Sequence, residues 1–121
     1  MAKKVLVVDD SPTDLQILST LLKKQGYDVV TAVDGEDAIA KATSSQPPLV
    51  VLDIILPKKN GFQVCRQLKT TPETKGIKVI LVSSKNQESD KVWGKRQGAD
   101  EYLAKPFTSD QLLGVVKRFA R

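Results

Sequence analysis

Residues 48–61 read PLVVLDIILPKKNG, an apolar segment that ends in a carboxylate. The four apolar residues 49–52 show no polar alternation, which is typical of a parallel strand that is covered on both faces. Asp53 follows them directly, before a loop that Pro57 and Gly61 interrupt. In open parallel sheets, ligands bind at the carboxyl ends of the strands. An acid in this position is nevertheless more often a helix cap or a loop residue, so the other strand ends have to decide its role.

Length and composition indicate one domain with an ordinary hydrophobic core. A chain of 121 residues can bury about two thirds of the surface that it exposes when unfolded. The single Cys65 and the absence of histidine exclude an internal disulfide framework and the usual zinc ligands. We expect Cys65 to be a small core residue. The first ten residues, MAKKVLVVDD, fit neither a signal peptide nor a membrane span, which predicts a cytoplasmic protein without membrane insertion.

The formal net charge of +5 is unevenly distributed along the chain. Residues 1–57 hold five lysines against eight acids, whereas residues 58–121 hold fourteen lysines and arginines against six acids. No basic run is longer than two residues, and aromatic residues are not interleaved with the basic ones. This pattern does not favour binding to nucleic acid and predicts a solvated basic face instead.

Five short apolar segments alternate with segments of helical periodicity. The expected strands cover residues 4–9, 27–32, 49–53, 78–83 and 101–104. Ser11, Asn60 and Thr108 are expected to cap helices, and Gln111 completes a capping box with Thr108. Short links between alternating strands and helices require parallel pairing through right-handed crossovers. The sequence therefore predicts a single doubly wound α/β domain over residues 1–121, with a five-stranded parallel sheet and helices on both faces.

The segment 84–97 gives the weakest helical signal. Only Val92 and Trp93 are candidates to anchor it to the sheet. Gly94 lowers its helix propensity by about 1 kcal/mol relative to alanine. We expect this helix to be the least stable of the five.

Polar residues end four of the five strands, and the expected topology brings these ends to one edge of the sheet. The residues are Asp9, Asp10, Asp53, Ser83 and Lys105. Three neighbouring carboxylates repel one another unless a divalent cation or an ammonium group offsets their charge. Oxygen ligands of this kind favour Mg²⁺, and Lys105 can supply the ammonium.

Four motifs resemble the response-regulator receiver domain of two-component signalling, in its stand-alone chemotaxis and motility type. They are VLVVDDS at 5–11, VLDIILPKKNG at 51–61, VSS at 82–84 and YLAKPF at 102–107. They occur in the order and at the spacing of the family and span nearly the whole chain. The resemblance implies a bacterial protein with a flavodoxin-like (βα)5 fold, the strand order 2-1-3-4-5 and a cis bond between Lys105 and Pro106.

The resemblance also implies a role for each strand-end acid. Asp53 would accept a phosphoryl group from the phosphohistidine of a histidine kinase or a histidine phosphotransfer protein. Asp9, Asp10, Asp53 and the backbone carbonyl of Ile55 would hold Mg²⁺, for which Mn²⁺ can substitute. We expect a phosphoacceptor domain that catalyses its own phosphotransfer and slow dephosphorylation, not a conventional enzyme.

Lys105 and Ser83 would bind the phosphoryl oxygens, and Tyr102 would act as a switch by moving inward behind Ser83. The resemblance makes Ile55 and Lys85 the variable positions that affect access of water to the phosphate. The aliphatic Ile55 should hinder water, so we expect slow loss of phosphate, although Lys85 can act in the opposite direction.

The chain ends directly after the last helix, so we expect no output domain and a signal that passes to a protein partner. In stand-alone receivers of this type, the partner binds the face formed by the fourth helix, the fifth strand and the fifth helix. Here that face is expected to present Lys91, Trp93, Lys95, Tyr102 and Lys117. These residues favour an acidic target peptide. We expect a monomer or a weak dimer that depends on phosphorylation.

Three other functions are less consistent with the sequence. A phosphatase or phosphotransferase with an aspartate nucleophile, acting on small molecules, commonly has a second aspartate where this chain has Ile55. A flavodoxin-like binding module would need a phosphate-binding loop after the first strand, where Asp9 and Asp10 would repel phosphate in the absence of metal. A receiver that works without phosphorylation is disfavoured because all the key residues are present.

Overall fold

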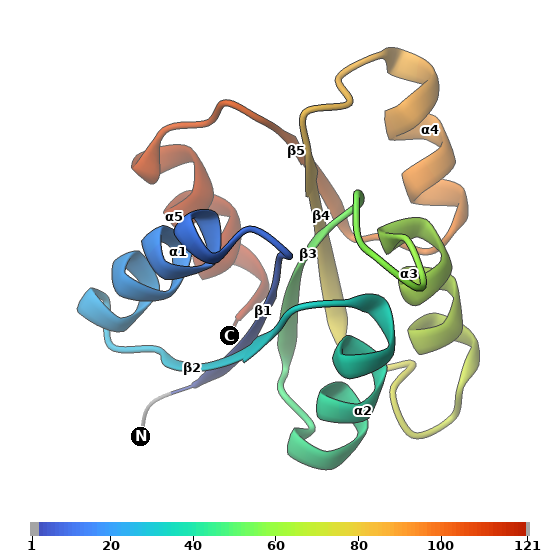
Figure 1. Ribbon diagram of the computed structural model, residues 1–121, viewed down its shortest axis with the longest axis horizontal. Helices are drawn as coiled ribbons and strands as arrows, with labels where there is room; N and C mark the ends of the chain where they lie inside the picture. The colour runs from blue at the N-terminus through green and yellow to red at the C-terminus, as the bar shows by residue number, and fades with distance from the viewer. Residues whose placement is uncertain (1–2, 121) are drawn as a thin grey trace.

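The computed structural model describes residues 3–120, in which strands and helices alternate (Figure 1). The strands are β1 (Lys4–Val8), β2 (Asp28–Ala32), β3 (Leu49–Asp53), β4 (Lys78–Ser83) and β5 (Glu101–Ala104). The helices are α1 (Pro12–Lys24), α2 (Gly35–Ser45), α3 (Gly61–Thr70), α4 (Glu88–Arg96) and α5 (Ser109–Phe119). The predicted order of elements is confirmed, with boundaries that differ by a few residues.

All five strands are parallel, and their order in the sheet is β2-β1-β3-β4-β5. Figure 1 shows α1 and α5 on one side of the sheet and α2, α3 and α4 on the other. In the register, Val7 lies opposite Val51, which in turn lies opposite Ile80. The predicted fold class is therefore confirmed, and the carboxyl ends of β1, β3 and β4 lie at the same edge of the sheet.

Each central strand contributes side chains to two separate hydrophobic cores. Val7 and Val51 pack against α1 and α5, whereas Leu6 and Val50 pack against the helices of the opposite face. All four residues are fully buried. Burial on both faces explains why these strands lack polar alternation.

Side-chain caps define where most helices begin. The backbone N–H of Asp14 donates to Ser11 Oγ at 3.3 Å, and that of Gln63 donates to Asn60 Oδ1 at 3.0 Å. Thr108 and Gln111 form the predicted capping box at α5. These contacts satisfy backbone donors that have no partner within the helix. The caps predicted from local sequence are thus confirmed.

The prediction that Val92 and Trp93 anchor α4 is wrong. Their exposed fractions are 45% and 50%, and the buried residue of this helix is Gly94. A Cβ atom on Gly94 would lie 3.0 Å from Leu81 Cδ1 and 3.1 Å from Tyr102 Cδ2. The backbone of α4 therefore approaches the sheet at Gly94. Because glycine has no side chain, it adds nothing to a hydrophobic pattern, and the sequence did not predict this contact.

The cis peptide bond between Lys105 and Pro106, implied by the resemblance, is present after β5. Cys65 is a free, fully buried thiol on α3, as predicted. Within residues 3–120, no helix combines the length and the apolar composition that a membrane span requires.

Candidate functional site

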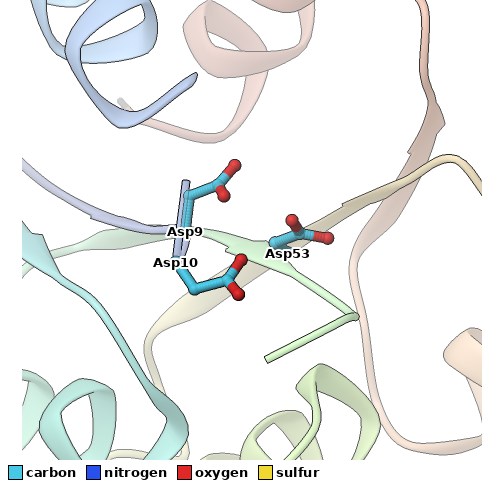
Figure 2. A group of neighbouring side chains, drawn as sticks. All are labelled: Asp9, Asp10 and Asp53. Atoms are coloured by element: carbon cyan, nitrogen blue, oxygen red, sulfur yellow. The ribbon is translucent and has the colours of Figure 1, made fainter. Parts of the chain in front are cut away.

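Three carboxylates meet at the carboxyl edge of the sheet (Figure 2). Asp9 and Asp10 follow β1, and Asp53 is the last residue of β3. One carboxylate oxygen from each lies within 4.8 Å of the others. Asp9 and Asp53 are buried, with exposed fractions of 1% and 7%, whereas Asp10 is exposed. The expected gathering of acids from two distant segments is therefore present.

Lys105 extends into this acid cluster from the segment after β5. Its Nζ lies 3.2 Å from Asp9 Oδ2 and 3.4 Å from Asp53 Oδ2. It also lies 3.6 Å from Asp14 Oδ2. The sequence did not lead us to place Asp14 here, although its position in the first turn of the helix after β1 was a usable signal. One ammonium among these carboxylates leaves the cluster with a negative formal charge.

The proton affinities of the cluster reflect burial and mutual attraction. Burial raises the pKa of Asp53 above its usual value; the Lys105 ammonium opposes this rise, and the Asp9 carboxylate adds to it. Burial disfavours the charged form of Lys105, but Asp53 and Asp9 outweigh it, so the pKa of this lysine is raised. Lys105 is therefore a permanent cation at neutral pH, held beside the oxygens of Asp53.

The loop after β3 is held close to Asp53 by short backbone contacts. The N–H of Ile55 donates to Asp53 Oδ1 at 3.2 Å, and the N–H of Gly61 donates to the Ile54 carbonyl at 2.8 Å. A Cβ atom on Gly61 would lie 2.5 Å from the Asp53 carbonyl oxygen. Only glycine fits at such a distance, so Gly61 determines how the loop turns back. The Ile55 side chain, which this loop carries, is 54% exposed.

The start of α2 supports the same loop from the other side. A Cβ atom on Gly35 would lie 2.3 Å from the Lys59 carbonyl oxygen. The N–H of Gly35 donates to the Pro57 carbonyl at 3.3 Å, and Lys58 has a φ of +68°. The sequence gives no sign of this contact, because Gly35 and Lys59 are 24 positions apart.

Ser83 and Tyr102 are connected through the backbone of Lys85. Ser83 is fully buried, and its Oγ accepts a hydrogen bond from the Lys85 N–H at 3.1 Å. The Tyr102 hydroxyl donates to the Lys85 carbonyl at 2.5 Å. The tyrosine is only 7% exposed, so its ring already lies inward in this structure. Burial, followed by the nearby Asp90 carboxylate, raises the pKa of Tyr102.

The residues proposed for the partner face do not all lie on one surface. Lys91 and Lys95 line a shallow hollow over β5, and Lys117 is exposed on α5. Tyr102 lines the same hollow as Lys91 and Lys95, although it is only 7% exposed. Trp93 lines a different hollow, between α3 and α4. Trp93 is two residues from Lys91 and from Lys95, a rotation of about 200° around the helix, so it lies on a different side of α4.

Comparison with models of known protein families identifies the family of this chain. The family model for the response regulator receiver domain matches residues 5–117. The chain belongs to this family. The predicted resemblance is confirmed over nearly the whole length of the receiver.

The two relatives and the solved structure described next match this chain over most of their lengths. It is 48% identical to protein PilH of Pseudomonas aeruginosa over 113 residues, which are 93% of each chain. It is 45% identical to protein PilG of the same organism over 114 residues, 94% of this chain and 84% of that one. The structure of the Vibrio cholerae chemotaxis protein CheY4 superposes with a TM-score of 0.92 at 32% identity, covering 98% of this chain and 99% of that chain.

Proposed function

We propose that this receiver is a response regulator in which Asp53 accepts a phosphoryl group from the phosphohistidine of a histidine kinase or phosphotransfer protein. The observation that supports this most directly is the position of the buried Asp53 carboxylate, 3.4 Å from Lys105 Nζ and beside two further carboxylates. In the step, an oxygen of Asp53 attacks phosphorus, and the phosphorus–nitrogen bond breaks. The leaving imidazole takes up a proton, and the product is an aspartyl phosphate.

The acid cluster fits Mg²⁺ or its substitute Mn²⁺, because its donors are all hard oxygens and its formal charge is negative. Asp9, Asp10 and Asp53 would hold the ion together with the backbone carbonyl of Ile55. When bound, a divalent cation would neutralise negative charge on the phosphoryl group during its transfer. Lys105 would hold a phosphoryl oxygen from the opposite side through its ammonium.

We propose that the signal leaves the site through Ser83 and Tyr102. The Ser83 hydroxyl would donate to a phosphoryl oxygen. Because Ser83 and Tyr102 both bond to the backbone of Lys85, a shift of this segment would change the acceptor of the tyrosine. The surface over β5 would then change for a protein partner in the cytoplasm. The receiver would act as a monomer or a weak dimer, in chemotaxis or motility.

Incubation with Mg²⁺ and acetyl phosphate tests the phosphoacceptor. We expect the mass to rise by one phosphoryl group in the wild type, and no rise in Asp53→Asn or with EDTA present. Trp93 is the sole tryptophan, so any change in tryptophan fluorescence during the reaction comes from this residue. Equal labelling of Asp53→Asn would exclude Asp53 as the acceptor.

The proposed partner face is tested by charge reversal at Lys91 and Lys95. If an acidic target binds over β5, the double change to glutamate should weaken binding and reduce its dependence on salt. The measurement is the affinity of the phosphorylated receiver for its target at low and high ionic strength. An affinity and a salt dependence equal to those of the wild type would rule out this face.

A further inference from the structure

A hollow on the surface between α3 and α4 is not used by the site or by the face over β5. Figure 1 shows the two helices next to each other on one side of the sheet. The hollow has a volume of about 450 Å³ and is lined by Asn60, Phe62, Gln63, Arg66, Trp93 and Gln97. Lys91 and Lys95 line a separate hollow on the other side of α4.

Two aromatic side chains and an arginine give this α3–α4 hollow the composition of a binding surface. Trp93 is 50% exposed, although it is the largest side chain of the protein. Phe62 packs against the core with only part of its ring. The side chain of Gln97 is buried, and its Oε1 lies 3.5 Å from Arg66 Nη1, at the limit of a hydrogen bond. Tryptophan and arginine are the residue types most enriched among those that dominate binding energy.

The charge around the α3–α4 hollow is positive. Its lining contains one arginine, three side-chain amides and no carboxylate. Helix α3 contains no acid, and Arg96 lies one turn after Trp93 on α4. The acid one turn before Trp93 is Asp90, and its Oδ2 accepts the Gln87 N–H at 3.3 Å at the start of the helix. An anionic group therefore meets a cation in the hollow and no opposing acid.

We propose that the α3–α4 hollow is a docking site for a segment of a partner protein that combines a carboxylate with a large apolar side chain. The carboxylate would pair with Arg66, and the apolar side chain would lie against Trp93 and Phe62. Removing these aromatic surfaces from water supplies the affinity, and the ion pair supplies the preference for acidic sequences. This site is distinct from the proposed face over β5, and binding to it does not require phosphorylation.

Gly94 of α4 lies next to both Tyr102 and Phe62, which lines the hollow. A Cβ atom on Gly94 would lie 3.1 Å from Tyr102 Cδ2 and 3.6 Å from Phe62 Cε1. The Tyr102 ring and Phe62, which lines the hollow, therefore both lie close to Gly94 beneath α4. A shift of Tyr102 would change the distance between α4 and Phe62, so phosphorylation would alter the affinity of the docked segment. This coupling, unlike the binding, rests on the proposed function.

The docking site can be tested by phage display of random twelve-residue peptides. The unphosphorylated full chain is the bait, and peptides that also bind the Arg66→Glu variant are removed by counter-selection. Retained peptides should be rich in aspartate or glutamate next to phenylalanine, tryptophan or leucine. Synthetic copies should bind at least tenfold more weakly to Arg66→Glu and to Trp93→Ala. The matched change Lys91→Glu, on the other side of α4, should alter the affinity less than twofold. Thermal unfolding of each variant checks that it is folded.

The proposal is overturned if no peptides are retained, if retained peptides lack acids, or if binding survives both changes in the α3–α4 hollow. Loss of binding in Lys91→Glu alone would move the site to the face over β5. Adding Mg²⁺ and acetyl phosphate to the peptide complex then tests the coupling. An unchanged affinity, with labelling of Asp53 verified by mass, would exclude the coupling and leave the docking site standing. Absence of labelling would instead count against the proposed function.

Discussion

At the scale of single residues, Ile55 is an exposed aliphatic residue two positions after Asp53. Its N–H binds Asp53, so its position is fixed, and its aliphatic side chain is 54% exposed. If Asp53 is phosphorylated as proposed, the aliphatic side chain two residues after it would hinder the water molecule that hydrolyses the phosphate. We expect Ile55→Asn to shorten the lifetime of the phosphate severalfold, equivalent to about 1 kcal/mol in activation free energy.

The measurement is the decay of the phosphorylated mass after acetyl phosphate is removed. Val92→Asn is the matched control, because Val92 is an aliphatic residue with similar exposure on α4. An equal lifetime in Ile55→Asn and wild type would show that Ile55 does not limit hydrolysis. Lys85, which is exposed beside the same edge, would then be the residue to change next.

Cys65 shows how far burial alone changes the chemistry of a side chain. Burial raises the pKa of its thiol to about 12, and its Sγ lies 3.5 Å from the Gln97 carbonyl oxygen. An exposed thiol has a pKa of about 8.5, so at pH 8.5 the unfolded chain holds much thiolate and the folded chain almost none. The free energy of unfolding should therefore decrease as the pH rises above 9, because the unfolded chain loses this proton first.

We expect Cys65 to react with a disulfide reagent such as DTNB at pH 8.5 only after unfolding in urea. The rate of thiol modification in the unfolded chain is the reference. The rate in the native chain should be lower by several orders of magnitude. Rapid modification of the native chain would contradict the buried position of the thiol on α3.

At the scale of the elements, two glycines in helices have opposite roles. Gly114 lies in α5 with open space around its missing side chain, whereas Gly94 faces Leu81 and Tyr102 at about van der Waals distance or less. Alanine at an exposed helix position is favoured over glycine by about 1 kcal/mol. Gly114→Ala should therefore stabilise the protein. In Gly94→Ala the same gain is opposed by crowding beneath α4.

Urea unfolding of the two variants tests this contrast under identical conditions. We expect the free energy of unfolding to rise in Gly114→Ala and to rise less, or to fall, in Gly94→Ala. An equal gain in both would mean that α4 moves away from the sheet without cost. The prediction that α4 is the least stable helix can be checked in the same samples by amide hydrogen exchange.

The first residue of α2 acts on the site through a contact of the backbone. A Cβ atom on Gly35 would lie 2.3 Å from the Lys59 carbonyl oxygen, so alanine must displace the loop that carries Ile55. We expect Gly35→Ala to raise the Mg²⁺ concentration needed for half-maximal labelling by acetyl phosphate and to lower the midpoint of urea unfolding. Gly76→Ala, which meets no atom within 4 Å, is the matched control. Wild-type behaviour of Gly35→Ala would show that the loop is not held by α2.

At the scale of the whole molecule, we expect the acid cluster to make stability depend on divalent cations. Three carboxylates share one edge with a single lysine, so an ion that binds only the folded chain should raise the melting temperature. At a Mg²⁺ concentration 100 times its dissociation constant, the gain is about 2.7 kcal/mol. Asp10→Asn should lose most of this gain without lowering the melting temperature in EDTA, since it removes a repulsion.

Thermal unfolding in EDTA and in increasing Mg²⁺ measures the effect. Asp28→Asn, an exposed acid at the opposite end of the sheet, controls for the change in net charge. A Mg²⁺-dependent shift of equal size in Asp10→Asn and Asp28→Asn would mean that the ion binds elsewhere.

The sequence by itself determined the order of the strands and helices, most of the helix caps and the acids at the strand ends. These features depend on residues a few positions apart: an apolar run such as 49–52 predicts a strand buried on both faces, and Asn60 caps the helix that follows it. The close resemblance to a known family then supplied the strand order and the cis bond at Pro106.

Only the tertiary structure decided which segments distant in sequence touch one another. The burial of Gly94, the contact of Gly35 with Lys59 and the ion pair of Asp14 with Lys105 follow from how closely the helices approach the sheet. The position of Trp93 beside α3 rather than over β5 has the same origin. Periodicity gives the face of a helix that is apolar, but the rotation and depth of each helix are set by packing against its neighbours.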